Sequence, residues 1–300
     1  MSAHLAINQV YTGDAFELMD RLEPSSVDLV LTDPPYFLDK LDDTWDPTEV
    51  HRTTKSQVIK HLPGGMKFDP EQGRNLQKWY VAVSERVYRA LKPGGFYLSF
   101  SSPRLAHRMA VAVEDAGFHI RDMFIWLYKE GRAKGFSLSR FAQKRGQALP
   151  KEWKTPQVRG NYEPIIVAQK PPEGTLLENF LKHGTGLFDF SARVSRGLTP
   201  SNVLQTEEIE GLPPIFLVPK PSRAEREGNA HPTVKPVELL RHLIKLTTQE
   251  GALVLDPFIG SGSTAIAALL ERRAFIGFEI HERYARIARA RIEKALQVES

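Results

Sequence analysis

A turn near the amino terminus carries residues that could hold a planar amine. Residues 27–31 form an almost fully apolar run that stops at Asp33, Pro34, Pro35 and Tyr36. Two successive prolines fix φ and remove two N–H donors, so the turn offers the acceptors of Asp33 and the Pro34 carbonyl. This rigid pair suits an amine with two N–H groups on a ring, and Tyr36 could stack on that ring. The alternative is a strand-terminating turn with Asp33 at the surface, because Asp and Pro are common turn formers.

A glycine-rich loop near the carboxyl terminus has the composition of a ligand-binding turn. It follows an apolar run and extends over residues 256–264, with Gly260 and Gly262 allowing close approach of a ligand to the backbone. Asp256 ends the preceding strand, where open α/β sheets bind ligands. Glu279 ends the next strand, 19 residues after Gly260, where an acidic side chain can accept hydrogen bonds from two ribose hydroxyls. A nucleoside-bearing cofactor is expected, and the alternative is a structural corner with a solvated Glu279, since such loops are weak evidence alone.

Together the two motifs resemble those of the amino-directed DNA methyltransferases, which modify adenine N6 or cytosine N4 with S-adenosylmethionine. The resemblance covers nearly the whole chain except parts of two inserts. Residues 33–36 match the family's catalytic motif, and residues 256–264 match its cofactor loop, with Ser263 where many members have Thr. The resemblance implies that a flipped base donates its amine N–H groups to Asp33 and the Pro34 carbonyl. The implied catalytic residues are Asp33, Pro34, Pro35 and Tyr36.

Three further segments match the family. Residues 231–236 resemble a motif placed over the methionine part of the cofactor, and Asp14 falls at a position beside the cofactor's adenine. Residues 161–167 look like the strand whose start lies near the flipped base. The implied cofactor-binding residues are Asp14, His231, Thr233, Lys235, Pro236, Asp256, Phe258, Gly260, Ser261, Gly262, Ser263, Thr264 and Glu279. No metal site is assigned.

The elements that must position these residues alternate between strand and helix. Strand-like runs occur at 5–10, 27–31, 96–100, 118–128, 164–168, 252–255 and 274–278, and helix patterns at 74–91, 103–116, 236–249, 264–270 and 282–297. This alternation predicts an α/β fold with a doubly wound, mostly parallel sheet. The resemblance makes it a Rossmann-like, seven-stranded methyltransferase sheet. Because the catalytic motif precedes the cofactor loop, the sheet is circularly permuted, and the first strand lies beside the one that ends at Glu279.

Two segments interrupt the alternation. Residues 37–73 are polar and rich in Pro and Gly, and residues 171–230 hold many Gly and Pro with little periodicity. Long irregular inserts of this kind are usually functional loops or a small subdomain. We expect residues 1–170 and 231–300 together to form the catalytic domain, with 171–230 as an inserted target-recognition segment. Residues 37–73 and 129–160 are expected to be DNA-facing loops.

Positive charge is concentrated in one segment. The chain has a net charge of +4, yet residues 129–159 hold nine Lys and Arg against two acids, which leaves the other 269 residues at −3. Such a basic stretch with interleaved aromatics is the pattern of a surface that follows phosphates, which favours double-stranded DNA as partner. The alternative is a solvated basic loop. The predicted nucleic-acid contacts are Lys129, Arg132, Lys134, Arg140, Lys144, Arg145, Lys151, Trp153, Lys154 and Arg159.

The composition excludes several other classes. The chain has no cysteine, and methylation at carbon 5 of cytosine needs a cysteine nucleophile, so that chemistry is excluded. Neither a run of about 18 apolar residues nor a signal-peptide pattern at the start is present. We therefore expect a cytoplasmic protein with no membrane partner.

Several alternatives remain open. In the family, Asp at position 33 goes more often with adenine N6, so that base is favoured over cytosine N4. An RNA or protein-glutamine methyltransferase is less favoured, because the glutamine enzymes usually carry Asn at this position and their glycine loop earlier. The incomplete glycine pattern argues against a nicotinamide oxidoreductase. A non-catalytic DNA-binding protein would not need both motifs. A homodimer and a cognate restriction enzyme, in a restriction-modification pair, are the further partners considered.

Overall fold

The structure is a computed structural model, which describes residues 5–35, 70–128, 135, 137–150, 153–156, 158–192, 199–205 and 235–298. An eight-stranded sheet runs through these residues in the order β1-β8-β7-β2-β3-β5-β4-β6. The strands are β1 (Gln9–Thr12), β2 (Val27–Thr32), β3 (Leu91–Phe100), β4 (His119–Leu127), β5 (Tyr162–Gln169), β6 (Val203–Gln205), β7 (Leu253–Asp256) and β8 (Ala274–Glu279). Among the described strands only β5 runs antiparallel to its neighbours, so the sheet is mostly parallel.

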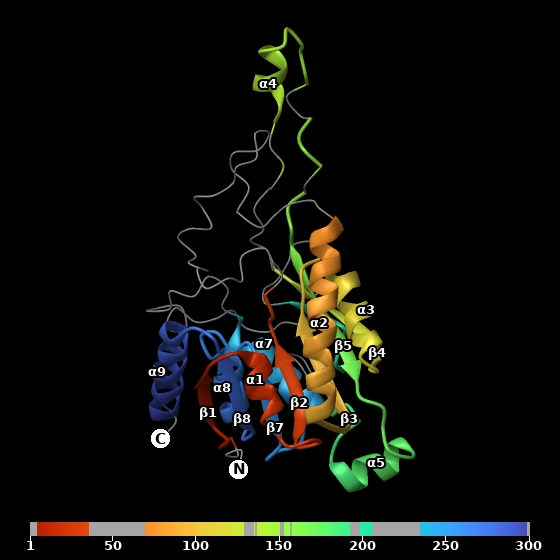
Figure 1. Cartoon of the computed structure of the whole chain (residues 1–300), viewed down its shortest axis with the longest axis vertical. Helices are drawn as coiled ribbons and strands as arrows, with labels where there is room; N and C mark the ends of the chain where they lie inside the picture. Colours follow the sequence, from red (N-terminus) through yellow and green to blue (C-terminus); the bar gives the residue numbers. More distant parts are fainter. Residues whose placement is uncertain are drawn as a thin grey trace.

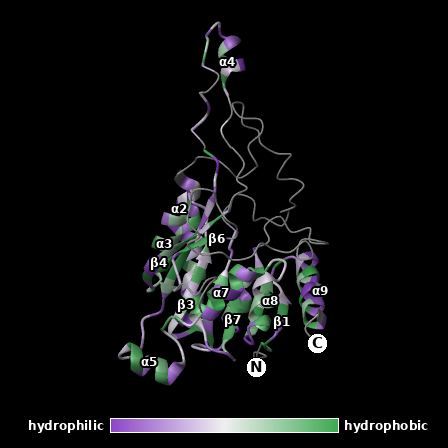
Figure 2. Ribbon diagram, turned by 180° about the vertical axis from the view of Figure 1, so that it is seen from behind, coloured by the Kyte–Doolittle hydropathy of each residue, from purple (hydrophilic) through white to green (hydrophobic). Residues whose placement is uncertain are grey.

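Helices cover both faces of this sheet (Figure 1). The described helices are α1 (Ala15–Asp20), α2 (Pro70–Ala90), α3 (Ala106–Asp115), α4 (Ser139–Gln143), α5 (Leu176–His183), α7 (Val237–Thr247), α8 (Ser263–Leu270) and α9 (Glu282–Val298), of which α4 lies away from the sheet. Alternation along β2 explains the two layers. Leu29 and Leu31 pack with α7, α8 and α9, while Val30 between them packs with α1, α2 and α3. Figure 2, seen from behind, shows the hydrophobic stretches of α7 and α8 lying over the sheet. The predicted doubly wound α/β fold is confirmed.

The predicted number of seven strands is wrong. The eighth is β6, a strand of three residues that pairs in parallel with β4 through Val203, Leu204 and Gln205. It lies within the segment expected to be irregular, and three residues are too few for a period-2 pattern to show. The predicted permutation holds, because β1 pairs in parallel with β8 from Gln9 opposite Ile276 to Thr12 opposite Glu279.

The first part of the predicted recognition segment packs on the sheet. Helix α5 begins with a capping box, in which Thr175 and Glu178 satisfy each other's backbone N–H groups. The fully buried Asn179 then donates to the carbonyls of Pro93 at 3.1 Å and Thr185 at 2.9 Å. Pro93 lies in the first part of β3, so α5 sits at the opposite end of the sheet from α4 (Figure 1).

No helix in the described ranges is long and apolar enough to cross a membrane.

Candidate active site

Four acidic side chains meet at one edge of the sheet. Strands β1, β8, β7 and β2 are parallel neighbours, so their carboxyl ends lie along the same edge. Asp256 and Glu279 are the last residues of β7 and β8, while Asp33 directly follows β2 and Asp14 follows β1 by two positions. The fold therefore brings together residues from both ends of the chain that sequence reasoning selected independently.

Asp33 is held by a buried lysine. The ammonium of Lys235, just before α7, donates to Oδ2 of Asp33 and lies 3.3 Å from Oε2 of Glu163 on β5. Only 9% of the Lys235 side chain is exposed. Burial alone would lower the pKa of Lys235, but the Asp33 and Glu163 carboxylates raise it above its usual value. Lys235 is therefore a charged group beside Asp33. Pro34 is buried in the same turn, and Pro35 is partly exposed.

Asp256 is almost completely buried at the end of β7. Its Oδ1 accepts hydrogen bonds from the Thr32 hydroxyl at 2.7 Å and the Phe258 N–H at 3.1 Å, and Thr264 contributes a further side-chain hydrogen bond. Burial raises the pKa of Asp256 to about 6, although these hydrogen bonds oppose the shift. The carboxylate thus lacks the water that would normally stabilise its charge, and a cationic or hydroxyl-bearing ligand would supply what is missing.

The glycine loop has a shape that other residues could not adopt easily. Gly260 and Gly262 have positive φ values of 53° and 85°. A Cβ at Gly262 would lie 3.1 Å from Cβ and 3.2 Å from Cα of Ala288 on α9. Helix α8 begins directly after Gly262, so the loop presents a helix amino terminus at the same edge. The buried Ser261, Ser263 and Thr264 complete this turn.

Arg291 of α9 supports the loop and was not identified from the sequence. Its guanidinium donates to the carbonyl and, at 2.9 Å, to the hydroxyl of Ser261, with Ser263 Oγ at 3.4 Å. Sequence spacing gives no signal for this contact, because Arg291 looks like any other basic residue of an amphipathic helix.

Glu279 and Asp14 lie on the other side of the loop. Glu279 is mostly buried, which raises its pKa, and its Oε1 accepts the His281 N–H at 2.9 Å. Asp14 caps α1 by accepting the N–H groups of Phe16 at 2.8 Å and Glu17 at 3.2 Å. The structure therefore gives Asp14 a local structural role.

Partly exposed aromatic rings continue this side of the edge. The ring of Phe258 lies 5.6 Å from that of Trp79 on α2, and Trp79 lies 6.3 Å from Phe16. Pro236, another residue predicted to bind the cofactor, is buried directly before α7. Trp79 and Phe16 were not selected from the sequence, where Trp79 fitted the core pattern of a helix. Together the rings of Phe258, Trp79 and Phe16 form an apolar surface against which a flat ring could pack.

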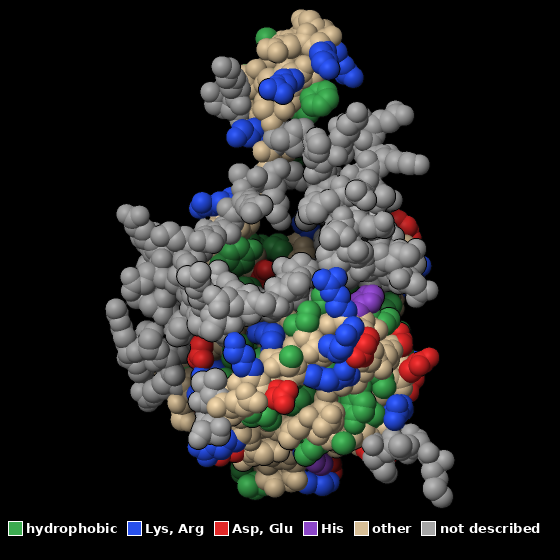
Figure 3. All heavy atoms as spheres, turned by 90° about the vertical axis from the view of Figure 1, so that its left-hand side faces the viewer, with side chains coloured by type: hydrophobic (Ala, Val, Ile, Leu, Met, Phe, Trp, Pro, Cys, Tyr) green, Lys and Arg blue, Asp and Glu red, His purple; other side chains and the backbone are tan. Residues whose placement is uncertain are grey.

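A basic arm leaves the sheet between β4 and β5, and we use this name for residues 129–161. At its base, Tyr128 and Asn161 are joined by backbone and side-chain hydrogen bonds of 2.9 and 3.0 Å. The arm extends beyond the carboxyl edge, with α4 at its tip (Figure 1). Trp153 and Phe141 are 71% and 54% exposed. The exposed predicted contacts on it are Arg140, Lys144, Arg145, Lys154 and Arg159. Figure 3 shows Lys and Arg side chains gathered over the arm.

Some predicted site residues lie outside the described residues. They are Tyr36, Lys129, Arg132, Lys134, Lys151, His231 and Thr233. Within the described ranges, no group of three or more His, Cys, Asp or Glu side chains could hold a metal ion.

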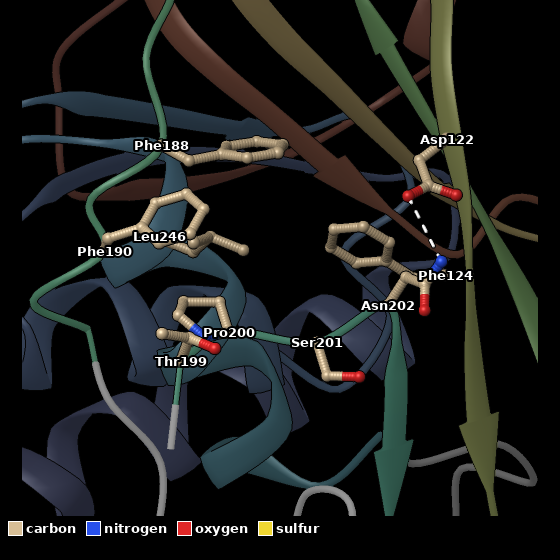
Figure 4. Close-up of a pocket in the computed structure, with 9 residues that line it drawn as sticks. All are labelled: Asp122, Phe124, Phe188, Phe190, Thr199, Pro200, Ser201, Asn202 and Leu246. Carbon is tan, nitrogen blue, oxygen red and sulfur yellow. Dashed lines mark hydrogen bonds between the residues drawn. The ribbon is translucent and has the colours of Figure 1, made fainter. Parts of the chain in front are cut away.

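A separate cavity of about 590 Å³ lies near the amino ends of β4 and β6 (Figure 4). Phenylalanine side chains line it together with Asp122, which accepts from Asn202 Nδ2 at 3.4 Å. None of the motif residues lines it, so we place the active site at the carboxyl edge and not in this cavity.

Comparison with known proteins identifies the family. A profile of DNA methylases that act at N6 or N4 matches residues 27–290. The Type II methyltransferase M.HindIII of Haemophilus influenzae is 30% identical, over 91% of each chain. Two solved structures share the fold: M1.HpyAVI with S-adenosylmethionine (22% identical, 95% and 98% of the two chains, TM-score 0.55) and the cytosine-N4-specific PvuII DNA methyltransferase (18%, 99% and 93%, TM-score 0.60). This chain belongs to the N6/N4 DNA methylase family, and it is an S-adenosylmethionine-dependent DNA amino-methyltransferase.

Proposed function

We propose that this methyltransferase modifies adenine N6 of a base flipped out of double-stranded DNA, with Asp33 as the acceptor for the target amine. The observation that carries the proposal is the short connection between the two motifs. The Thr32 hydroxyl, one residue before Asp33, bonds to Asp256 at the start of the glycine loop at 2.7 Å. The acceptor turn and the cofactor loop are therefore direct neighbours.

The residues at the edge fit S-adenosylmethionine. This cofactor carries an ammonium group, ribose hydroxyls and a flat adenine, and the edge offers two buried carboxylates with raised pKa values in Asp256 and Glu279. The close packing of Gly262 on Ala288 fixes the position of the loop against α9, and Phe258 gives a ring surface for stacking. When bound, the cofactor supplies an electrophilic methyl group on a sulfonium.

The protein's part in the reaction is acceptance and alignment. An exocyclic amine is a poor nucleophile because its lone pair is conjugated with the ring. Asp33 and the Pro34 carbonyl accept its two N–H groups, which draws the nitrogen towards tetrahedral geometry and localises the lone pair. Alignment of that lone pair with the methyl group accounts for much of the remaining acceleration. Tyr36 stacks on the flipped base in this proposal.

Adenine and cytosine present the same exocyclic amine to the acceptors, so the acceptor geometry alone does not select the base. The proposal of adenine rests on the aspartate at position 33. The likeness to the cytosine-N4-specific PvuII enzyme is one of fold at 18% identity, and a shared fold does not select the base.

The basic arm is our candidate for the main phosphate contact, together with residues 37–73. We assign target recognition to the later part of residues 171–230. Their first part contains α5, which packs at the end of the sheet opposite the carboxyl edge. The catalytic domain then comprises residues 1–170 and 231–300. A cytoplasmic location, a homodimer and a cognate restriction enzyme belong to the same proposal.

The experiment is methyl transfer from labelled S-adenosylmethionine by wild type and Asp33→Ala, with cofactor affinity measured in parallel. The variant should lose transfer to DNA while its cofactor Kd stays within about threefold, since Asp33 serves the amine. Asp20→Ala removes an exposed carboxylate at the end of α1, where it pairs with Arg86, and is the matched control. Full activity of Asp33→Ala overturns the role of Asp33. Mass spectrometry of the nucleosides should give N6-methyladenine, and N4-methylcytosine instead would correct the base.

A further inference from the structure

We propose that Lys235 is a positioning residue for methyl transfer, which fixes the Asp33 carboxylate for the target amine and is itself anchored by Glu163. The proposal rests on the proposed role of Asp33 as acceptor. It gives Lys235 a different task from the contact with the cofactor that its motif suggested.

The two prolines after Asp33 explain why a lysine is needed. In an ordinary turn, an Asp side chain is fixed by accepting the backbone N–H two residues later. Here that residue is Pro35, and Pro34 precedes it, so neither position has an N–H to donate. The turn that creates the acceptor pair therefore has no N–H at these two positions to orient Asp33. The Lys235 ammonium supplies a donor to Oδ2 of Asp33 from a distant part of the chain.

The position of the Lys235 ammonium at the carboxyl edge of the sheet supports this assignment. Asp33 follows β2 and Glu163 lies on β5, and the end of β3 separates these two strands. The Lys235 ammonium lies between Asp33 and Glu163, 3.3 Å from Glu163 Oε2. It is also 5.0 Å from the ring centre of Phe100, the last residue of β3. Three elements therefore define the place of one cation.

The charges around Lys235 favour a stable group of ion pairs over a transient contact. A buried ammonium is costly unless it is paired, and Lys235 has carboxylates on two sides. Loss of Glu163 would remove one of the two carboxylates that flank Lys235 and would allow the ammonium to shift. Lys235 holds Asp33 at Oδ2, which fixes the plane of the carboxylate that faces the target amine in the proposed function. A carboxylate gripped at one oxygen keeps a defined direction for the other.

The test separates positioning from cofactor binding. Lys235→Met should lower kcat about 100-fold, which is the scale of a misplaced reacting group, while the KM for DNA and the Kd for S-adenosylmethionine stay within about threefold. Lys235→Arg retains the charge and should recover part of the loss. Lys245→Met, which lies on α7 and is paired with Glu271, is the control and should behave as wild type. A tenfold weaker cofactor Kd with unchanged kcat would make Lys235 a cofactor ligand and overturn the proposal.

Glu163→Gln keeps Lys235 and is the second variant in case Lys235→Met does not fold. It should lower kcat about tenfold with the same unchanged KM and Kd, in line with the usual effect of removing an outer partner of a functional group. The double variant Glu163→Gln with Lys235→Met should be no slower than Lys235→Met, because Glu163 acts through Lys235. Additive losses would reject this link. If Asp33→Ala is inactive while Lys235→Met retains wild-type kcat, only the positioning proposal fails; an active Asp33→Ala instead removes the proposed function.

Discussion

The Thr32 hydroxyl donates a 2.7 Å hydrogen bond to Oδ1 of Asp256, and this bond joins the strand before the acceptor turn to the strand before the glycine loop. The two residues are 224 positions apart in the sequence. They meet because β2 and β7 are parallel neighbours, with Leu29 opposite Val254 and Val30 opposite Leu255. The bond also acts on chemistry, since it favours the ionised form of Asp256.

The pKa of Asp256 predicts how cofactor affinity changes with pH. Burial raises this pKa to about 6, so the carboxyl group is protonated below that pH and ionised above it. A cationic ammonium binds the ionised form, so the affinity for S-adenosylmethionine should rise between pH 5 and 7.5 and level off above. Below the midpoint the fall should approach tenfold per pH unit. Binding measured by calorimetry over this range checks the prediction.

Three variants identify the group responsible. Asp256→Asn should bind more weakly and lose the inflection, whereas Glu279→Gln should retain it. Thr32→Val should move the midpoint above 6, because the Thr32 hydrogen bond lowers the Asp256 pKa. The stability of the free protein should change in the opposite direction. A carboxyl group with a raised folded-state pKa contributes stability that is lost as pH rises through about 6. An unchanged midpoint in Asp256→Asn would assign the inflection to another group.

The basic arm predicts a salt-dependent affinity for DNA. Replacing Arg140, Lys144 and Arg145 together by Ala should weaken binding and reduce the slope of log K against log salt by about 2 to 3, roughly 0.9 for each lost phosphate contact. Trp153→Ala should weaken binding without changing the slope, because Trp153 carries no charge. Fluorescence anisotropy titrations between about 50 and 300 mM salt provide the slope.

The control for the arm lies at the other end of the sheet. Lys182 on α5 is exposed and pairs with Glu173, so Lys182→Ala should leave the slope unchanged. An unaltered slope in the triple variant would mean that these side chains form a solvated basic loop, and the phosphate contacts would have to come from other residues.

The same end of the sheet carries a prediction about stability. Asn179→Ala removes the side-chain hydrogen bonds to Pro93 and Thr185 and the one that Oδ1 accepts from Glu173 N–H at 2.8 Å. Leaving such buried groups without partners should lower the free energy of unfolding by about 2 kcal/mol. Urea denaturation measures this loss, and Leu181→Ala on the exposed side of α5 should show little change. Normal stability with altered target choice would place α5 in recognition.

Local patterns predicted most of the fold and selected the two loops that meet at the carboxyl edge of the sheet. Strands such as β2 and β7 are short apolar runs bounded by turns, and the motifs that follow them are contiguous in sequence. Helix α5 was missed although Thr175 and Glu178 form a capping box, a local signal present in the sequence.

The contacts that organise the site could not be predicted in this way. The bond from Lys235 to Asp33 spans 202 positions, and its need arises from the missing N–H groups of two prolines. Glu163 had one weak signal, since it is a charged residue at the start of an apolar strand. Pairings of this kind depend on which strands become neighbours, and that is decided by the packing of the whole sheet.

Arg291 provides the last prediction, because it supports the glycine loop without being part of it. Its guanidinium bonds to the carbonyl and hydroxyl of Ser261, which ties α9 to the loop between Gly260 and Gly262. Arg291→Met removes these donors but keeps an apolar stem of similar length, so the loop should lose its fixed shape. The Kd for S-adenosylmethionine should then rise about tenfold, which corresponds to about 1.4 kcal/mol and is close to the lower end of what a hydrogen bond with a charged group contributes. The kcat at saturating cofactor should change little, since the bonds from Arg291 to Ser261 support the cofactor loop. Arg286→Met on the same helix, where the guanidinium is exposed and 3.8 Å from Glu282, should bind as wild type does. Equal cofactor affinity in both variants would show that the loop keeps its shape through its glycines and Asp256 alone.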